Sequence, residues 1–283
     1  MDRHEAQALH GGEIAPAVRA WYGPEDLGSA PAFAGGFINF GYWQGISLDR
    51  PLGAEDRIRS QRNLYRRVLR ALGPGGGAGK AVEIGCGLGL GSALALEEFG
   101  FDAVTGMDIH PEQLARARRV HAELLERSPD RLRFAQGSAE HMPFADGQFD
   151  SLFTLEAAQH FRDLAAFGRE GARVLRPGGR LVVSSFFVPD GGAGKAEALA
   201  DRLESFAIDL DVAHRLDELL DALQDAGLSE VRVESIGEHV WAGFDSFLAG
   251  INQPEQWPRN FLRAYREGLL DYYVVTAQRP AGA

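Results

Sequence analysis

The sequence has little cysteine, little lysine and no long apolar run, and each shortage excludes a class of protein. Cys86 is the single cysteine, so neither an intramolecular disulfide nor a cysteine-based metal site can form. The longest apolar stretches, such as residues 181–188, are as long as a strand, whereas a membrane helix needs roughly 18 apolar residues. These shortages predict a cytoplasmic protein with no membrane partner.

Positive charge is also scarce. Lysine and arginine number 29 against 40 aspartates and glutamates, which gives a net charge of −11, and Lys80 and Lys195 are the two lysines. The arginines are scattered among acidic residues, whereas nucleic acids and anionic membranes bind clusters of positive charge. We therefore expect no nucleic acid partner and predict a small-molecule ligand.

Short apolar runs alternate with amphipathic segments from residue 81 onward, which is the pattern of a parallel sheet with helices on both faces. Strands are predicted at residues 81–84, 102–108, 132–136, 151–155, 180–186, 230–235 and 271–278. Helices are predicted between them at residues 90–99, 111–126, 164–175 and 216–226. The predicted fold class is α/β, with an open, mostly parallel sheet of seven strands.

Three pieces lie outside this alternation. Residues 1–72 show helical periodicity and predict an N-terminal helical cap, separated by a glycine-rich linker from a core domain at residues 73–283. Inserts at residues 189–215 and 237–268 are predicted to form a lid over the bound acceptor. The aromatic residues of the second insert favour either lid packing or an apolar acceptor pocket. If the first 30 residues cross to a second copy of the chain, the protein is a homodimer, and the sequence leaves this question open.

A glycine-rich turn follows the first predicted strand. Gly85, Gly87 and Gly89 come directly after Glu83, and glycines let the chain turn sharply and let a ligand lie against backbone N–H groups. The turn therefore predicts a nucleotide-like ligand, and a glycine-rich connection without a ligand is the alternative. A Walker phosphate loop is excluded by the residues around Lys80, and a dinucleotide fingerprint fits poorly because Leu94 stands where the third glycine belongs.

This acidic residue and the three glycines resemble motif I of the class I S-adenosylmethionine (SAM)-dependent methyltransferases. The resemblance implies a Rossmann-like fold, SAM as cofactor, and Glu83 near the amino group of its methionine half. Asp108 ends the second predicted strand, where the family binds the ribose diol and where a carboxylate can accept two hydrogen bonds. A cap on the helix that starts at Pro111 is the alternative for Asp108.

Further segments continue the resemblance over residues 81–188. Residues 137–144 resemble the adenine-binding turn of the family, with Ser138 where aspartate is common. Residues 174–181 resemble the turn before the fifth strand of the family. The cofactor contacts that the resemblance implies beyond the motif and ribose positions are Ile109, Gln113, Ser138, Ala139, Glu140 and Leu155.

Residues 37–43 resemble the Gly-Tyr-Trp segment of sterol, cyclopropane and sugar methyltransferases. This resemblance implies that Tyr42 packs against the methionine half of SAM or forms a hydrogen bond with it, and an aromatic anchor for the cap is the alternative. His160 follows the fourth predicted strand and is the candidate general base for a hydroxyl acceptor, with Glu156 beside it. A histidine that only caps a helix is the alternative. Sugar O-methyltransferases tend to have an acidic residue where this chain has Ser185.

The expected function is methyl transfer from SAM to a small, partly apolar metabolite in bacterial natural-product biosynthesis, to oxygen and with His160 as base. The second hypothesis is C-methylation of a terpene-like alkene, with Glu156 and aromatic residues stabilising a carbocation. The third is a SAM-binding cyclase or isomerase that does not methylate. No Asp and Asn cluster typical of a magnesium site occurs, so no metal is expected.

Overall fold

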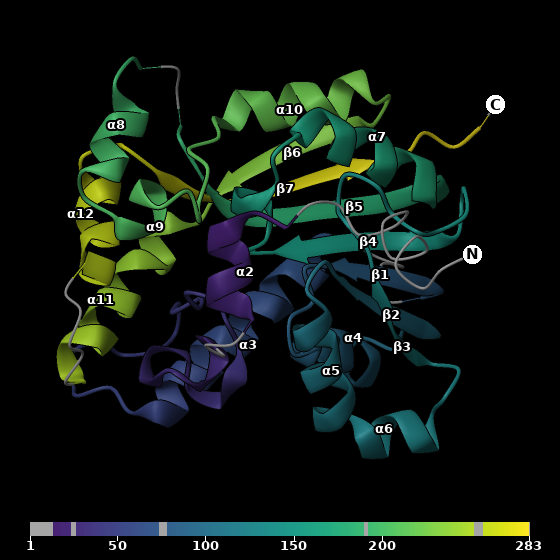
Figure 1. The fold of residues 1–283 in the computed structure, drawn as a ribbon, viewed down its shortest axis with the longest axis horizontal. Coiled ribbons are helices and arrows are strands. Elements are labelled where there is room, and N and C mark those ends of the chain that lie inside the picture. Colours follow the sequence, from purple (N-terminus) through teal and green to yellow (C-terminus); the bar gives the residue numbers. More distant parts are fainter. Residues whose placement is uncertain (1–13, 24–26, 74–77, 190–191, 252–256, 283) are drawn as a thin grey trace.

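A single seven-stranded sheet runs through the computed structural model, which describes residues 14–23, 27–73, 78–189, 192–251 and 257–282 (Figure 1). The strand order is β3-β2-β1-β4-β5-β7-β6. The strands are β1 (Lys80–Ile84), β2 (Ala103–Asp108), β3 (Leu132–Gln136), β4 (Phe149–Leu155), β5 (Leu175–Phe187), β6 (Ser229–Ser235) and β7 (Asp271–Gln278). Strands β1 to β5 are parallel, and β7 runs antiparallel to β5 and β6. The predicted open, mostly parallel sheet is confirmed.

The helices predicted between the strands correspond to α4 (Leu90–Glu98), α5 (Pro111–Val120), α6 (Ala122–Arg127), α7 (Leu164–Val174) and α10 (Leu216–Asp225). The helix predicted at residues 111–126 is divided at His121. The ring of His121 is buried there, and its Nε2 lies 3.0 Å from the carbonyl oxygen of Leu88. This contact joins the start of α6 to the loop that precedes α4.

The sheet is covered on both faces. Consecutive residues of a strand point to opposite faces, and both Val182 and Val183 of β5 are fully buried. Val182 belongs to the core formed with α3 (Ala54–Ala71) and α4, and Val183 to the core formed with α7 and α10. The carboxyl ends of the parallel strands are the edge where ligands of such sheets bind.

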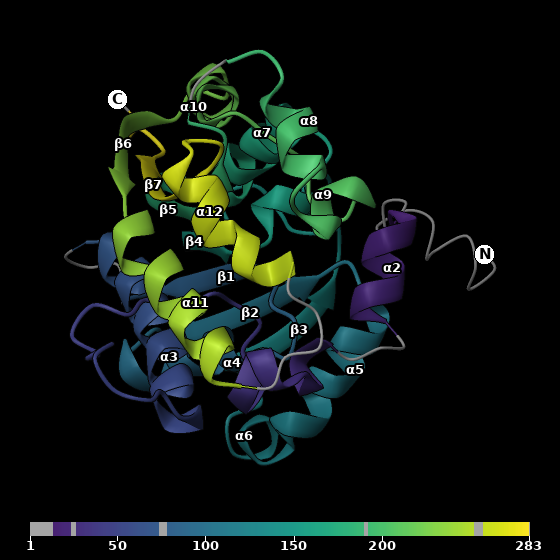
Figure 2. The same ribbon diagram turned by 90° about the vertical axis from the view of Figure 1, so that its left-hand side faces the viewer.

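The remaining helices are α2 (Pro16–Tyr22), α8 (Lys195–Ala200), α9 (Glu204–Ala207), α11 (Trp241–Gly250) and α12 (Asn260–Arg266). Figure 2 shows α11 and α12 side by side, and α2 beside α5 and α9. Trp241 and Phe261 stack with ring centroids 5.3 Å apart, and both are buried. The aromatic residues described in the second insert therefore pack mainly against one another and the core.

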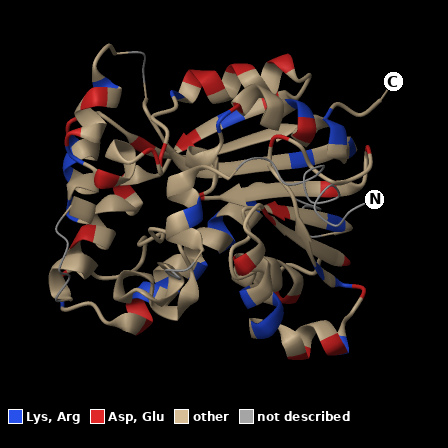
Figure 3. Ribbon diagram, viewed as in Figure 1, with Lys and Arg blue, Asp and Glu red and all other residues tan. Residues whose placement is uncertain are grey.

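Both signs of charge are scattered over the outer helices in the view of Figure 3. Within the described ranges, no helix is long and apolar enough to cross a membrane. The first 30 residues, considered above for a homodimer, lie partly outside the described residues, as does the glycine-rich linker.

Candidate active site

The glycine-rich turn joins the carboxyl end of β1 to α4. The N–H groups of Gly85 and Cys86 donate to the carbonyl oxygen of Met107 at 2.8 and 3.0 Å, which fixes the turn beside the end of β2. Gly85 has a φ of 74°, and a β-carbon there would overlap Ala157. Gly87 has a φ of 50° and open space where a β-carbon would stand. The backbone at Gly87 is thus accessible to a ligand.

Asp108 is held at the end of β2 by two backbone hydrogen bonds. One carboxylate oxygen accepts from the N–H of Gly87 and the other from the N–H of His110, both at 2.8 Å. Burial raises the pKa of Asp108, and these two hydrogen bonds lower it. The N-cap of α5 is His110, so the alternative of Asp108 as the helix cap is not what the structure shows. The carboxylate is oriented before any ligand binds.

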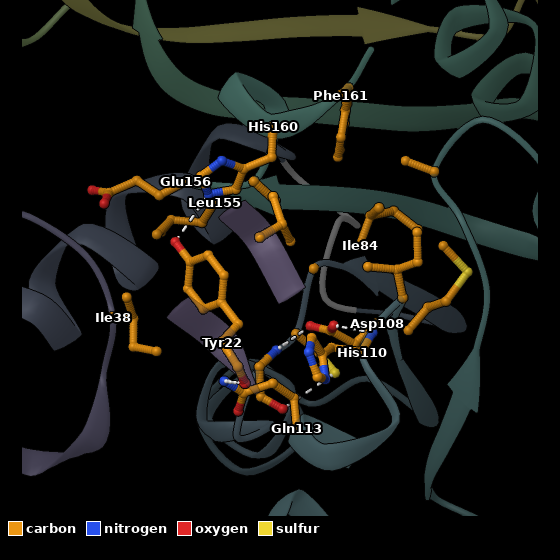
Figure 4. A pocket seen from close by; sticks show the side chains of 18 of the residues that line it. Tyr22, Ile38, Ile84, Asp108, His110, Gln113, Leu155, Glu156, His160 and Phe161 are labelled. Atoms are coloured by element: carbon orange, nitrogen blue, oxygen red, sulfur yellow. Dashed lines mark hydrogen bonds between the residues drawn. The ribbon is translucent and has the colours of Figure 1, made fainter. Parts of the chain in front are cut away.

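A cavity lies at the carboxyl ends of the parallel strands (Figure 4). It contains most of the residues that the sequence predicted for the site, from four strand ends and the loops after them. These are Gly85, Gly87, Asp108, Ile109, Gln113, Ser138, Ala139, Glu140, Leu155, Glu156 and His160. Tyr42, Glu83 and Gly89 do not line it.

Glu83 is fully buried beneath the turn and not in the cavity wall. Its carboxylate accepts from the hydroxyl of Tyr65 at 2.9 Å and from the hydroxyl of Ser92 at 2.5 Å. Burial raises the pKa of Glu83 to about 7, against the lowering effect of the hydrogen bonds from Ser92 and Tyr65. Glu83 therefore ties β1 to α3 and α4. Gly89 is the N-cap of α4, with a φ of 69°.

Tyr42 lies at a different, polar cavity that it lines with Arg67, Glu234 and His239. Its hydroxyl donates to Gln44 at 2.7 Å, and its ring packs edge-on against His239. This position does not support the predicted contact between Tyr42 and the methionine half of the cofactor. It agrees with the alternative of an aromatic anchor for the N-terminal segment.

His160 presents Nε2 to the cavity. The Nε2 atom lies 2.9 Å from the hydroxyl of Tyr22, as the dashed line in Figure 4 marks. The Nδ1 atom lies 2.8 Å from the carbonyl oxygen of Leu210 and 3.3 Å from a carboxylate oxygen of Asp211. A carbonyl oxygen only accepts, so Nδ1 carries the proton and Nε2 of the neutral ring carries the lone pair. Burial raises the pKa of Tyr22 well above its ordinary value, so its hydroxyl is the donor to Nε2.

Glu156 also lines the cavity and has a left-handed backbone, with a φ of 50°. One carboxylate oxygen accepts from the N–H of Phe40 at 2.7 Å and from the hydroxyl of Tyr272 at 2.9 Å. Burial raises the pKa of Glu156 to about 8, while these hydrogen bonds and the charge of Arg57 lower it. At neutral pH this group is mostly protonated, and its contacts fasten the segment around Phe40 to the sheet.

Helix α2 closes one side of the cavity. Carbonyl oxygens at its C-terminal end accept hydrogen bonds from α5: Gln113 Nε2 and Arg116 Nη1 donate to Tyr22 at 3.0 and 3.1 Å. Val18 packs with Leu210 and contacts the region of Ile109. The N-terminal segment thus covers the carboxyl edge of the sheet and brings Tyr22 to His160. Among the described residues, no group of three or more His, Cys, Asp and Glu is placed to hold a metal ion.

A family described as "Methyltransferase domain" matches residues 82–183. The methyltransferase GfsG of Streptomyces halstedii is 32% identical over 202 residues, which cover 71% of this chain and 69% of that protein. The chain belongs to the SAM-dependent methyltransferases.

The methyltransferase is also similar to erythromycin 3''-O-methyltransferase of Saccharopolyspora erythraea, with 26% identity over 270 residues, 87% of this chain and 84% of the relative. Among solved structures, geranyl diphosphate C-methyltransferase from Streptomyces coelicolor A3(2), with bound Mg²⁺, geranyl-S-thiolodiphosphate and S-adenosylhomocysteine, superposes with a TM-score of 0.77. That superposition covers 95% of this chain and 99% of the other at 20% identity, and it shows the fold.

The cofactor of the methyltransferase is SAM, and the cavity fits it. Asp108 presents an oriented carboxylate for a diol, and the backbone at Gly87 is open. Gln113 lines the cavity with a buried side-chain oxygen that has no partner among the described residues, which suits a donor on the ligand. Ser138 Oγ accepts from the N–H of Glu140 at 3.2 Å, so it also shapes the turn that follows β3.

Sequence reasoning missed two residues that contact His160. Tyr22 comes from the N-terminal segment and Asp211 from the insert at residues 189–215. Neither stands in a motif, and both are far from His160 along the chain. The remaining signal for Tyr22 is weak: it is one of two adjacent aromatic residues at the end of a short helix.

Proposed function

We propose that the methyltransferase transfers the methyl group of SAM to a hydroxyl oxygen of a small, partly apolar metabolite of secondary metabolism, with His160 as general base. One observation carries this proposal. Nε2 of His160, a residue that lines the cavity, carries the lone pair and accepts from the hydroxyl of Tyr22 at 2.9 Å, with Nε2 of Gln159 3.3 Å away. A hydroxyl of an acceptor in the same place would be held for proton removal.

Bound SAM would supply the methyl group on a positively charged sulfur, which would be the leaving group and keep the electron pair of the carbon–sulfur bond. The acceptor oxygen forms the new bond to carbon, and its proton moves to Nε2 of His160. The acceptor takes the position of the Tyr22 hydroxyl, so the end of α2 must shift as the acceptor enters. Hydrogen bonds from Gln113 and Arg116 to the carbonyl of Tyr22 hold this end over the cavity when it is closed.

The acceptor side of the cavity is apolar. Among the residues that line the cavity, Ile14, Val18, Ile38 and Phe161 have apolar side chains, and we assign them to the acceptor. These side chains favour a metabolite with a hydrophobic surface next to its reacting hydroxyl. The names of the relatives support the same class, since the erythromycin enzyme is an O-methyltransferase. We propose that the N-terminal cap and the insert at residues 189–215 together form the lid over this acceptor.

C-methylation of an alkene receives less support. It needs a negative charge near a carbocation, whereas Glu156, with a pKa of about 8, is mostly neutral at neutral pH. Of the aromatic residues expected to face the cation, Trp241 and Trp43 are buried, Trp241 stacks on Phe261, and Tyr42 lies at the second cavity. A cyclase that only binds SAM would form no methylated product, so a methyl-transfer assay separates it from both methylation hypotheses.

The test uses SAM with an isotopically labelled methyl group and a panel of hydroxylated polyketides and glycosides, with and without matched alkenes. We expect a product with the label on oxygen. We also expect the rate in His160→Asn to be reduced by a factor of about 100 or more, since a general base contributes at least that factor. His239→Asn, in the second cavity, is the matched control and keeps the wild-type rate. A carbon-bound label, no labelled product, or an unchanged rate in His160→Asn would contradict the proposal.

A further inference from the structure

The insert at residues 189–215 builds a loop against the far side of His160. This loop follows α9, and in it the N–H groups of Leu210 and Asp211 both donate to the carbonyl of Ser205 at 2.9 Å. The N–H of Val212 donates to the carbonyl of Gln159, next to His160 itself, at 2.8 Å. The loop is therefore fixed both internally and to the turn that carries the histidine.

The loop directs two acceptors at Nδ1 of His160. The carbonyl of Leu210 lies 2.8 Å away and the carboxylate of Asp211 3.3 Å away, with the Asp211 side chain 6% exposed. The carbonyl alone fixes which nitrogen carries the proton, but it brings no full charge. Of the two, the side chain of Asp211 is the group that can balance the positive charge that the ring acquires when Nε2 takes a proton. Burial raises the pKa of Asp211, and the charge of the His160 ring lowers it, so a protonated ring favours the carboxylate form.

Ser185 stands where sugar O-methyltransferases tend to have an acidic residue, and it does not contact His160 directly. Ser185 on β5 donates to the side-chain oxygen of Gln159 at 2.6 Å, and the side-chain nitrogen of Gln159 donates to the carbonyl of Glu156 at 2.9 Å. Ser185 thus braces Gln159, the residue before His160. The carboxylate against His160 comes from another element of the fold.

We propose that Asp211 is the positioning residue of the base: with the carbonyl of Leu210 it holds the His160 ring, and its charge stabilises the protonated ring that methyl transfer produces. This inference rests on the proposed function, because it assigns a partner to the proposed base. The titratable groups that face His160 among the described residues are Tyr22 from α2, Asp211 from the loop and, farther away, Asp108 from β2.

The test follows the His160 ring by NMR in the full chain saturated with S-adenosylhomocysteine, without an acceptor. Signals of the eight histidines are compared between wild type and His160→Asn to identify the one from His160. In Asp211→Asn we expect the titration midpoint of this signal to fall by about one pH unit, because a neighbouring negative charge that favours the charged ring is lost. The shape of the side chain is retained.

Asp209→Asn is the matched control, since Asp209 is two residues away in the same loop, exposed, and has a left-handed φ of 58° that asparagine tolerates. Its midpoint is expected to equal that of wild type. Equal midpoints in Asp211→Asn and wild type would overturn the proposal. If Asp211→Asn does not fold, as judged by circular dichroism, Asp211→Ser with its smaller neutral side chain replaces it under the same criterion.

The NMR result is independent of the acceptor, so it separates this inference from the proposed function. With an acceptor from the methyl-transfer panel, we also expect kcat to fall about tenfold in Asp211→Asn while KM stays within twofold, because the charge acts after the acceptor binds. A changed KM with an unchanged kcat would overturn the positioning role. Full activity of His160→Asn would overturn the base assignment and leave the measured effect of Asp211 on the ring in place.

Discussion

Glu83→Gln tests the buried carboxyl beneath the glycine-rich turn. Burial raises the pKa of Glu83 from 4.5 to about 7, although hydrogen bonds from Ser92 and Tyr65 oppose the shift. In an unfolded chain this carboxyl returns to its ordinary pKa. Between these two values the folded protein holds a proton that the unfolded chain releases.

The free energy of unfolding therefore falls as the pH rises through this range, because the folded state binds the extra proton. The full loss is about 3 kcal/mol, and most of it falls between pH 5 and pH 8. The glutamine variant cannot ionise and lacks this loss. Other buried acids such as Glu156 and Asp108 titrate in both proteins, so their contributions cancel in the difference.

Urea unfolding followed by circular dichroism, at pH values from 5 to 8, measures that difference. As the pH rises from 5 to 8, we expect the difference in the free energy of unfolding to change in favour of Glu83→Gln by about 2–3 kcal/mol, which corresponds to about 4 °C in Tm for a chain of this length. Glu126→Gln, the same change at an exposed site on α6, is the control and should give a constant difference. A difference for Glu83→Gln that does not vary with pH would refute the reasoning.

Three further variants test the cavity. Asp108→Ala should weaken S-adenosylhomocysteine binding about 100-fold or more in calorimetry, because hydrogen bonds to a charged group contribute about 1.5–3 kcal/mol each. The control Asp102→Ala, next to the opposite end of β2, should keep the wild-type affinity. Equal affinities of Asp108→Ala and wild type would contradict the assignment of Asp108 to the ribose. Tyr42→Phe should leave that affinity within twofold, since Tyr42 lies at the other cavity, and a tenfold loss would restore the predicted contact. Gly91→Ala should destabilise the protein by about 1–3 kcal/mol in thermal unfolding, because a β-carbon there overlaps the ring of Tyr65, whereas an unchanged Tm would contradict this packing.

The sheet and the cofactor side of the cavity could be predicted because their signals are local. A strand of buried residues, a turn that needs glycine and an acidic residue at the next strand end occur within 30 residues, between Ala81 and Asp108. The order of strands then places both turns at the same edge. The break at His121 was missed because it depends on a contact with Leu88, which no local periodicity records.

Side-chain direction was harder to predict than position. Glu83 occupies the expected place in the motif, but Tyr65 of α3 and Ser92 of α4 bind its carboxylate inside the protein. Tyr42 occupies the expected place in its segment, but the segment is anchored with that ring against His239. In both cases the neighbours that decide the direction come from distant parts of the chain.

Asp211 lies against His160 although it does not stand at the position where sugar O-methyltransferases tend to have their acidic residue. A protonated imidazole needs an oxygen acceptor and a nearby negative charge, and neither requirement specifies which element supplies them. The serine at position 185 therefore did not decide whether the base has an acidic partner, since Asp211 meets the ring from the insert. The same insert packs against α2 through Leu210, and α2 lines the cavity with Val18 and Tyr22, so the proposed partner of the base is in contact with the helix that faces the proposed acceptor. A change in α2 that suits a new acceptor would then also move the proposed partner of the base, which would couple acceptor choice to the rate of proton removal.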